Sequence, residues 1–129
     1  TGDIGYTVAL AAKVPEIAIY SGNDDMTIPI MSLGGKGVIS VVANILPKDT
    51  HDMCAYCLAG ETDKALKLQL SMLDVMNAMF LEVNPVPVKT ALGLMGYTVG
   101  NLRAPLYEMD EANVEKMKKA MTDYGIKLA

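Results

Sequence analysis

Apolar residues recur along the chain in two patterns, and each pattern predicts a different kind of element. A helical repeat of apolar positions covers residues 4–14, and Pro15 ends it because proline cannot continue a helix. Two short stretches, residues 17–20 and 38–43, are rich in β-branched residues and apolar on both of the faces that a strand presents. Such stretches are typical of buried strands in a parallel sheet that helices cover on both sides.

The connection between these two stretches has the length of a helix, which predicts a β-α-β unit with parallel strands. Residues 21–24 form the turn after the first strand, and Asp24 is the expected N-cap of a helix over residues 25–33. The glycine-rich residues 34–37 end that helix, and no further strand is predicted after Pro47. The remaining elements are helices over residues 49–58, 61–83, 88–94 and 110–124, with an extended segment over residues 102–106.

The longest of these helices carries a regular apolar face. Leu66, Leu70, Leu73 and Phe80 lie at helical spacing and are expected to form that face. The chain also holds 10 methionines, three of them on the same helix. Methionine is a flexible side chain that fills irregular gaps, so we expect the methionines to pack in the core rather than to bind copper or peptides.

Two parallel strands do not make a complete sheet. Both edges of the pair would expose unpaired backbone donors and acceptors, and the pair alone cannot bury side chains on both faces. The missing strands must come from an N-terminal portion or from a companion chain. The sequence begins at Thr1 without a methionine or a signal-like segment, so we interpret this start as an internal cut in a larger α/β domain.

Composition and charge exclude several classes of function. The chain has 129 residues, of which 51% are apolar and 20% are charged, as expected for one packed domain. A net charge of −4 and only 5% aromatic residues disfavour a nucleic-acid surface, which needs clustered cations and stacking platforms. No apolar run is long enough to cross a membrane. Two cysteines do not make a disulfide framework, so a reducing cytoplasm is expected.

Four motifs follow one another in a familiar order and spacing. They are Ser-Gly-Asn-Asp-Asp at residues 21–25, Gly-Val-Ile-Ser-Val at 37–41, Asn-Pro-Val-Pro-Val-Lys at 84–89 and Leu-Arg-Ala-Pro-Leu at 102–106. Together they closely resemble the dihydrodipicolinate synthases of the N-acetylneuraminate lyase superfamily of class I aldolases, and the resemblance covers essentially the whole chain. The second and third motifs favour the synthase branch over the other aldolases of the superfamily.

The resemblance implies a fold and a division of the chain. Residues 1–60 would be the last part of a TIM (β/α)₈ barrel, with residues 17–21 as strand seven and 38–43 as strand eight. Residues 61–129 would be a C-terminal helical region. The partner of this piece would be the missing N-terminal half of the barrel, and the complete protein would be a homotetramer.

The resemblance also implies a reaction. The family condenses pyruvate with L-aspartate-4-semialdehyde in lysine and diaminopimelate biosynthesis, as a lyase that needs no metal and no other cofactor. A lysine forms a Schiff base with pyruvate, and the resulting enamine attacks the aldehyde. That lysine is expected just upstream of Thr1, and the tyrosine and threonine that relay protons lie further upstream. The chain therefore holds no catalytic residue and is expected to be inactive alone.

Three residues of this chain are carried over as substrate-binding candidates. Gly22 would leave room and exposed backbone beside the Schiff base, although a glycine there can also serve only to give the turn a positive φ. Ile39 would contact pyruvate through its main chain and side chain, although the pattern alone makes it a core residue. Asn84 would approach the mouth of the pocket, although asparagine before proline is also a common turn former.

Other motifs are better explained without a function. Cys54 and Cys57 have C-x-x-C spacing but lie in a helical pattern without a second cysteine pair, so two half-buried helix cysteines are expected. Lys89 has the chemistry for an imine but no apolar surroundings, and His51 is expected to be exposed. Two further interpretations remain open: another pyruvate-dependent aldolase of the superfamily, or a non-catalytic half-barrel module that binds or assembles with other chains.

Overall fold

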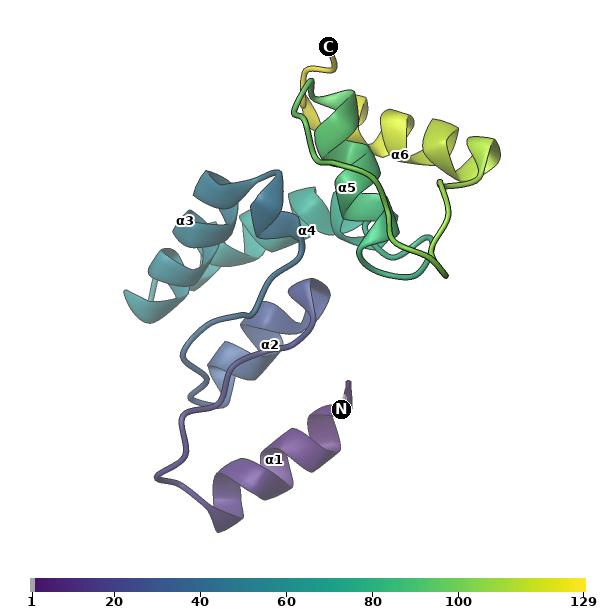
Figure 1. Cartoon of the computed structure of the whole chain (residues 1–129). Coiled ribbons are helices and arrows are strands. Elements are labelled where there is room, and N and C mark those ends of the chain that lie inside the picture. The colour runs from purple at the N-terminus through teal and green to yellow at the C-terminus, as the bar shows by residue number, and fades with distance from the viewer. Residues whose placement is uncertain (1) are drawn as a thin grey trace. The chain divides into compact units, whose positions relative to one another are not determined.

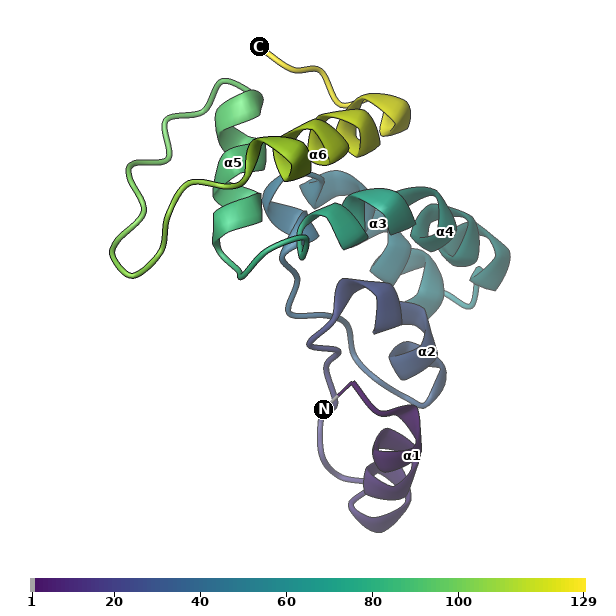
Figure 2. The same cartoon turned by 90° about the vertical axis from the view of Figure 1, so that its right-hand side faces the viewer.

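The computed structural model describes residues 2–129 and is built from helices and turns (Figures 1 and 2). Thr1, next to which the Schiff-base lysine is predicted, lies outside this range. The elements are α1 (Ile4–Lys13), the 3₁₀ turn η1 (Asp24–Met26), α2 (Thr27–Ser32), the 3₁₀ turn η2 (Val42–Asn44), α3 (Pro47–Leu58), α4 (Thr62–Ala78), α5 (Val86–Leu94) and α6 (Glu111–Tyr124). The chain divides into two compact units, of which unit 1 ends at Leu70 and unit 2 begins at Ser71.

The predicted α/β class is wrong for this chain, because residues 2–129 form no sheet. Strands seven and eight of a barrel, and the β-α-β unit, are reduced to one isolated parallel bridge between Ser21 and Val38. A pair of segments without further neighbours cannot bury both faces, so a regular ladder does not extend along them. Consistent with this, Ile17 and Tyr20 are 48% and 53% exposed.

Helices that carry their own start and stop signals form where the sequence predicts them. The Asp3 side chain accepts a hydrogen bond from the Tyr6 N–H and caps α1, which ends at Lys13 before Pro15. Helix α3 begins at Pro47, where a proline loses no helical hydrogen bond. Gly125 ends α6 with a φ of 101°, a left-handed conformation that glycine adopts without strain.

The α2 region is held by a side chain from far along the sequence. Gln69 of α4 is 7% exposed, and its Oε1 accepts a hydrogen bond from the Ile28 N–H at 2.8 Å. Its Nε2 donates to the Asp25 carbonyl oxygen at 2.5 Å. One amide therefore satisfies both a free donor at the start of α2 and an acceptor in the preceding turn, and it fixes this turn against α4 within unit 1.

The predicted apolar face of α4 is wrong. Leu66, Leu70, Leu73 and Phe80 are 44%, 61%, 38% and 50% exposed, although their spacing is helical. The buried residues of this stretch lie on a different face and include three methionines: Ala65, Gln69, Met72, Val75, Met76, Ala78 and Met79. Met53, Met117 and Met121 are also fully buried, so the expected role of methionine in core packing is confirmed.

In unit 2, a loop connects α5 to α6, and a side chain from before α5 binds the start of α6. The segment 102–106 was predicted to be extended, but it turns, because the Leu106 N–H donates to the Arg103 carbonyl oxygen. Glu82 Oε1 accepts hydrogen bonds from the Asp110 N–H and from Asn113 Nδ2, each at 2.9 Å. The carboxyl group of Glu82 thus covers the start of α6, where a negative group is favoured.

Along the described part of the chain, no helix has the length and apolarity needed to span a bilayer.

Candidate functional site

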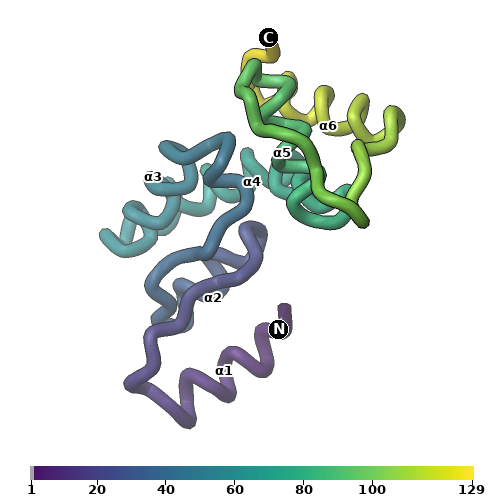
Figure 3. Tube along the Cα trace, in the orientation of Figure 1, coloured from purple at the N-terminus to yellow at the C-terminus, as the bar shows by residue number. Residues whose placement is uncertain are grey.

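The candidate site in unit 1 is built on two backbone segments that run in parallel (Figure 3). The Ser21 N–H donates to the Gly37 carbonyl oxygen, and the Ile39 N–H donates to the Ser21 carbonyl oxygen, both at 2.8 Å. The Lys36 N–H donates to the Ile19 carbonyl oxygen at 2.8 Å. These three bonds place the Ser-Gly-Asn-Asp-Asp motif beside the Gly-Val-Ile-Ser-Val motif, as the predicted site requires.

Ser21 shapes the turn that presents Gly22. The Ser21 side chain is buried; its hydroxyl group donates to the Asn23 carbonyl oxygen at 2.7 Å and accepts from the Asn23 N–H at 3.2 Å. This local ring of hydrogen bonds fixes the backbone on both sides of Gly22. Gly22 is exposed at the tip of that ring.

The structure gives no internal reason for a glycine at position 22. Gly22 is not among the glycines with positive φ, so the interpretation of this residue as a conformational requirement of the turn is wrong. A Cβ built on Gly22 would meet no heavy atom within 4 Å among the described residues. The backbone here is therefore open to a molecule from outside, and a side chain would occupy that space.

A hollow of about 160 Å³ lies beside this turn, between α1 and residues 19–23. Its lining includes Tyr6, Thr7 and Leu10 of α1, together with Ser21 and Gly22. This volume is below the range of about 300–1,000 Å³ that is typical of sites for drug-sized ligands. The hollow therefore has room only for a small molecule.

Ile39 is not the core residue that its pattern predicts. Its side chain is 71% exposed, while its N–H is bonded to the Ser21 carbonyl oxygen. The backbone of Ile39 is thus fixed next to Gly22, and the side chain is left free. The structure brings these two predicted site residues together within unit 1.

The third candidate, Asn84, lies in unit 2. It is exposed and follows α4 in the sequence, and its peptide bond to Pro85 is cis. Pro85 is the N-cap of α5, so Asn84 precedes the start of that helix directly. Near it in sequence, Lys89 donates from Nζ to the Asn101 carbonyl oxygen at 2.9 Å, so this ammonium group is engaged with the backbone.

Sequence reasoning missed the role of Asp24. Its side chain is 2% exposed, and it does not cap α2 as expected. Its Oδ2 accepts hydrogen bonds from the Val41 and Val42 N–H groups, both at 3.0 Å. No local pattern predicts this pairing, because the donors lie 17 and 18 residues further along the chain. The buried carboxyl group thus joins the two motifs a second time.

The C-x-x-C pair in α3 has the properties expected of packing residues. Cys54 and Cys57 are both free and half-buried, which confirms that prediction. Burial raises the pKa of the Cys54 thiol, and Cys57 and Asp24 raise it further, so the reactive thiolate is disfavoured. Over residues 2–129, no cluster of three or more His, Cys, Asp or Glu side chains is arranged to hold a metal ion.

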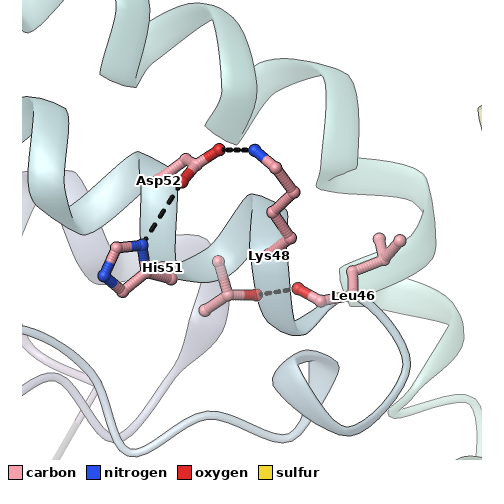
Figure 4. A network of polar contacts seen from close by, with 5 residues as sticks. Leu46, Lys48, His51 and Asp52 are labelled. Carbon is pink, nitrogen blue, oxygen red and sulfur yellow. Dashed lines mark hydrogen bonds and ion pairs between the residues drawn. The ribbon is translucent and has the colours of Figure 1, made fainter.

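His51, predicted to be exposed, has a side chain that is 78% exposed on α3 (Figure 4). Its Nδ1 lies 3.3 Å from Asp52 Oδ1, and Lys48 Nζ pairs with Asp52 Oδ2. Thr50 in the same turn donates from its hydroxyl group to the Leu46 carbonyl oxygen at 2.8 Å. This network stabilises the first turns of the helix at the surface and leaves the histidine accessible to water.

The pKa of Asp52 is expected to lie below its ordinary value, because the hydrogen bond from Lys48, followed by that from His51, favours the charged form. The pKa of Asp52 should be higher in the Lys48→Ala variant than in the unmodified chain. Added salt should reduce this difference in pKa, since the Lys48–Asp52 pair is at the surface. The pKa of Asp52 is lower in the folded state than in the unfolded state. The small contribution of the Lys48–Asp52 pair to stability is therefore present above the unfolded-state pKa, and it is lost as the pH falls through the folded-state pKa. An NMR titration of the Asp52 carboxyl carbon measures the shift, and identical curves for both proteins would contradict it.

Comparison with known proteins places this chain in one family. The model of the dihydrodipicolinate synthetase family matches residues 1–124. The 4-hydroxy-tetrahydrodipicolinate synthase of Caldicellulosiruptor bescii is 55% identical over 126 residues, which cover 98% of this chain and 43% of the relative. The enzyme of the same name from Clostridium tetani is 50% identical over 127 residues, covering 98% of this chain and 43% of the relative.

Solved structures agree. The dihydrodipicolinate synthase from Aquifex aeolicus superposes with a TM-score of 0.94 at 32% identity, covering 99% of this chain and 44% of that structure. The synthase from Acinetobacter baumannii, solved in complex with pyruvate, superposes with a TM-score of 0.93 at 38% identity, covering 98% and 44%. The chain thus spans less than half the length of the relatives that it matches.

Proposed function

The chain belongs to the dihydrodipicolinate synthetase family, and from this premise we propose that it is part of a 4-hydroxy-tetrahydrodipicolinate synthase. Such an enzyme is a lyase that condenses pyruvate with L-aspartate-4-semialdehyde through a lysine Schiff base, in lysine and diaminopimelate biosynthesis. The observation that carries the proposal is the shared name of relatives that are 50–55% identical over nearly the whole chain. Because the chain covers about 43% of them, the activity is proposed for the complete protein.

Within this proposal, Gly22 and Ile39 lie against the reacting pyruvate. Gly22 leaves the space of a side chain empty, and its open backbone borders the hollow beside α1. The Ile39 N–H is already bonded to Ser21, so a main-chain contact to the substrate would go through the Ile39 carbonyl oxygen. A carbonyl oxygen accepts hydrogen bonds and suits a donor such as a protonated imine nitrogen. For the complete enzyme, Asn84 is proposed to approach the mouth of the substrate pocket.

The remaining parts of the enzyme are proposed to come from outside this chain. The Schiff-base lysine would be supplied by the sequence that precedes this chain in the relatives, and the complete enzyme would assemble as a homotetramer. The two free, half-buried thiols are compatible with a cytoplasmic location, in which cysteines stay reduced. The division into a barrel portion before residue 61 and a helical portion after it stays a prediction about the complete protein.

Borohydride reduction in the presence of pyruvate tests the proposal. The complete protein is expected to gain a stable pyruvate adduct, because reduction of the imine makes its carbon–nitrogen bond permanent. Peptide mass spectrometry should place the adduct on a lysine outside residues 1–129, and the 129-residue chain alone should gain none. An adduct on Lys36 or Lys89 would contradict the proposed site, and the absence of any adduct on the complete protein would contradict the proposed reaction.

A further inference from the structure

The backbone that follows Ile39 is held by one buried carboxyl group. Asp24 Oδ2 accepts from the consecutive N–H groups of Val41 and Val42, at 3.0 Å each, and Val42 is fully buried. The Asp24 backbone is itself fixed, because the Thr27 hydroxyl group donates to its carbonyl oxygen at 2.8 Å inside the same buried turn. An acceptor that binds two neighbouring N–H groups defines both the position and the direction of the chain at that point.

Within residues 2–129, hydrogen bonds of the backbone rather than side-chain packing hold Ile39 in place. Its side chain is 71% exposed, so packing does not fix it. Its N–H is bonded to Ser21 on one side, and two residues later Asp24 binds the chain on the other side. The short stretch between these two anchors carries the Ile39 carbonyl group. Both anchors belong to the Ser-Gly-Asn-Asp-Asp motif, so the backbones of Gly22 and Ile39 form one frame.

We infer that Asp24 is a positioning residue: its buried carboxyl group holds the Ile39 carbonyl group in the orientation that binds the reacting pyruvate. This inference rests on the proposed function, because it needs a substrate at Ile39. Asp24 acts only through the backbone and does not touch the substrate. A group that is displaced by about 1 Å in an active site lowers catalysis by about 100-fold, so the loss of one anchor of this frame should affect pyruvate binding measurably.

Steady-state kinetics of the complete enzyme test the inference with three variants. Asp24→Ala removes the acceptor and should raise the KM for pyruvate by about tenfold or more, since two hydrogen bonds to a buried acceptor are lost. Asp24→Asn keeps one acceptor oxygen but places an amide N–H₂ where Oδ1 is buried without a partner among residues 2–129, so it should raise this KM by about threefold. Asp25→Asn removes the same charge from the neighbouring exposed residue and should leave the KM unchanged.

The KM separates this role from a merely structural one. A variant that only folds less well lowers the apparent kcat per total protein, while the KM of its folded fraction stays the same. An unchanged KM for pyruvate in both Asp24 variants would overturn the inference, and if Asp24→Ala does not fold, an unchanged KM in Asp24→Asn overturns it alone. Borohydride trapping on the unmodified enzyme is measured alongside. Trapping with unchanged KM values refutes only the role of Asp24, whereas no trapping refutes the proposed function and this inference together.

Discussion

Replacing Gln69 by alanine is expected to lower the free energy of unfolding of the chain by about 2–3 kcal/mol, because it leaves one buried and one partly buried backbone group without partners, and a buried unpaired group costs about 1–3 kcal/mol. These groups are the Ile28 N–H and the Asp25 carbonyl oxygen, which the Gln69 amide binds at 2.8 and 2.5 Å. Alanine favours a helix slightly more than glutamine does, but that gain is only a few tenths of a kcal/mol. Urea unfolding followed by circular dichroism measures the loss.

Two further variants identify the cause of the loss. Gln69→Glu has nearly the same size and keeps an acceptor for Ile28, but it loses the donor to Asp25, so a loss of about 1–2 kcal/mol is expected. Lys67→Ala, at an exposed position of the same helix, should change the free energy of unfolding by less than about 0.5 kcal/mol. If Gln69→Ala were as stable as Lys67→Ala, the bridge between α4 and the start of α2 would contribute nothing.

The sequence predicts those parts of the fold whose signals are local. Pro15 was expected to end the first helix, and α1 ends two residues before it; the helices predicted over residues 49–58 and 110–124 agree with α3 and α6 to within two residues. A proline or a glycine acts on the backbone of its own turn, whatever lies around it. Such ends are therefore predictable without knowledge of the tertiary structure.

Partners that lie far apart in sequence were not predictable. Asp24 was expected to cap the helix next to it, but its acceptor oxygen binds donors 17 and 18 residues away. Gln69 reaches Ile28 over 41 residues, and Glu82 reaches the start of α6 over 28 residues. A cap depends only on which side chain arrives at the free N–H group, and the local sequence does not contain that information.

Burial was also misjudged where a pattern allowed two answers. The leucines of α4 have helical spacing, but so do Met72, Met76 and Met79 on another face, and the methionines are the buried ones. The stretches 17–20 and 38–43 have the composition of strands, and composition cannot supply the neighbouring segments that a sheet requires. For the candidate site, the resemblance of the motifs implies Gly22 and Ile39, while the hydrogen bonds that bring these two residues together are visible only in the structure.

Replacing Gly22 by alanine is expected to lower kcat/KM for pyruvate by about 100-fold in the complete enzyme, while the protein stays folded. Stability should not fall, because φ at Gly22 is not positive and a Cβ would meet nothing within 4 Å in the described chain. Alanine should even stabilise the fold by about 0.4–1 kcal/mol, since it restricts the unfolded chain. The methyl group would instead occupy the space proposed for pyruvate, and a loss of about 100-fold corresponds to about 2.7 kcal/mol of binding in the transition state.

Gly93→Ala is the matched control, because Gly93 is also exposed, has no positive φ and has open space at its Cβ position. It is the second-last residue of α5, where alanine is favoured over glycine by less than the roughly 1 kcal/mol of a helix interior, so stability should not fall and kcat/KM should not change. Both variants add one methyl group to an open backbone position, and only one of these positions is proposed to face a substrate. Equal kcat/KM values for Gly22→Ala and Gly93→Ala would show that the space beside Gly22 is not occupied during the reaction, and the pocket would have to be sought elsewhere.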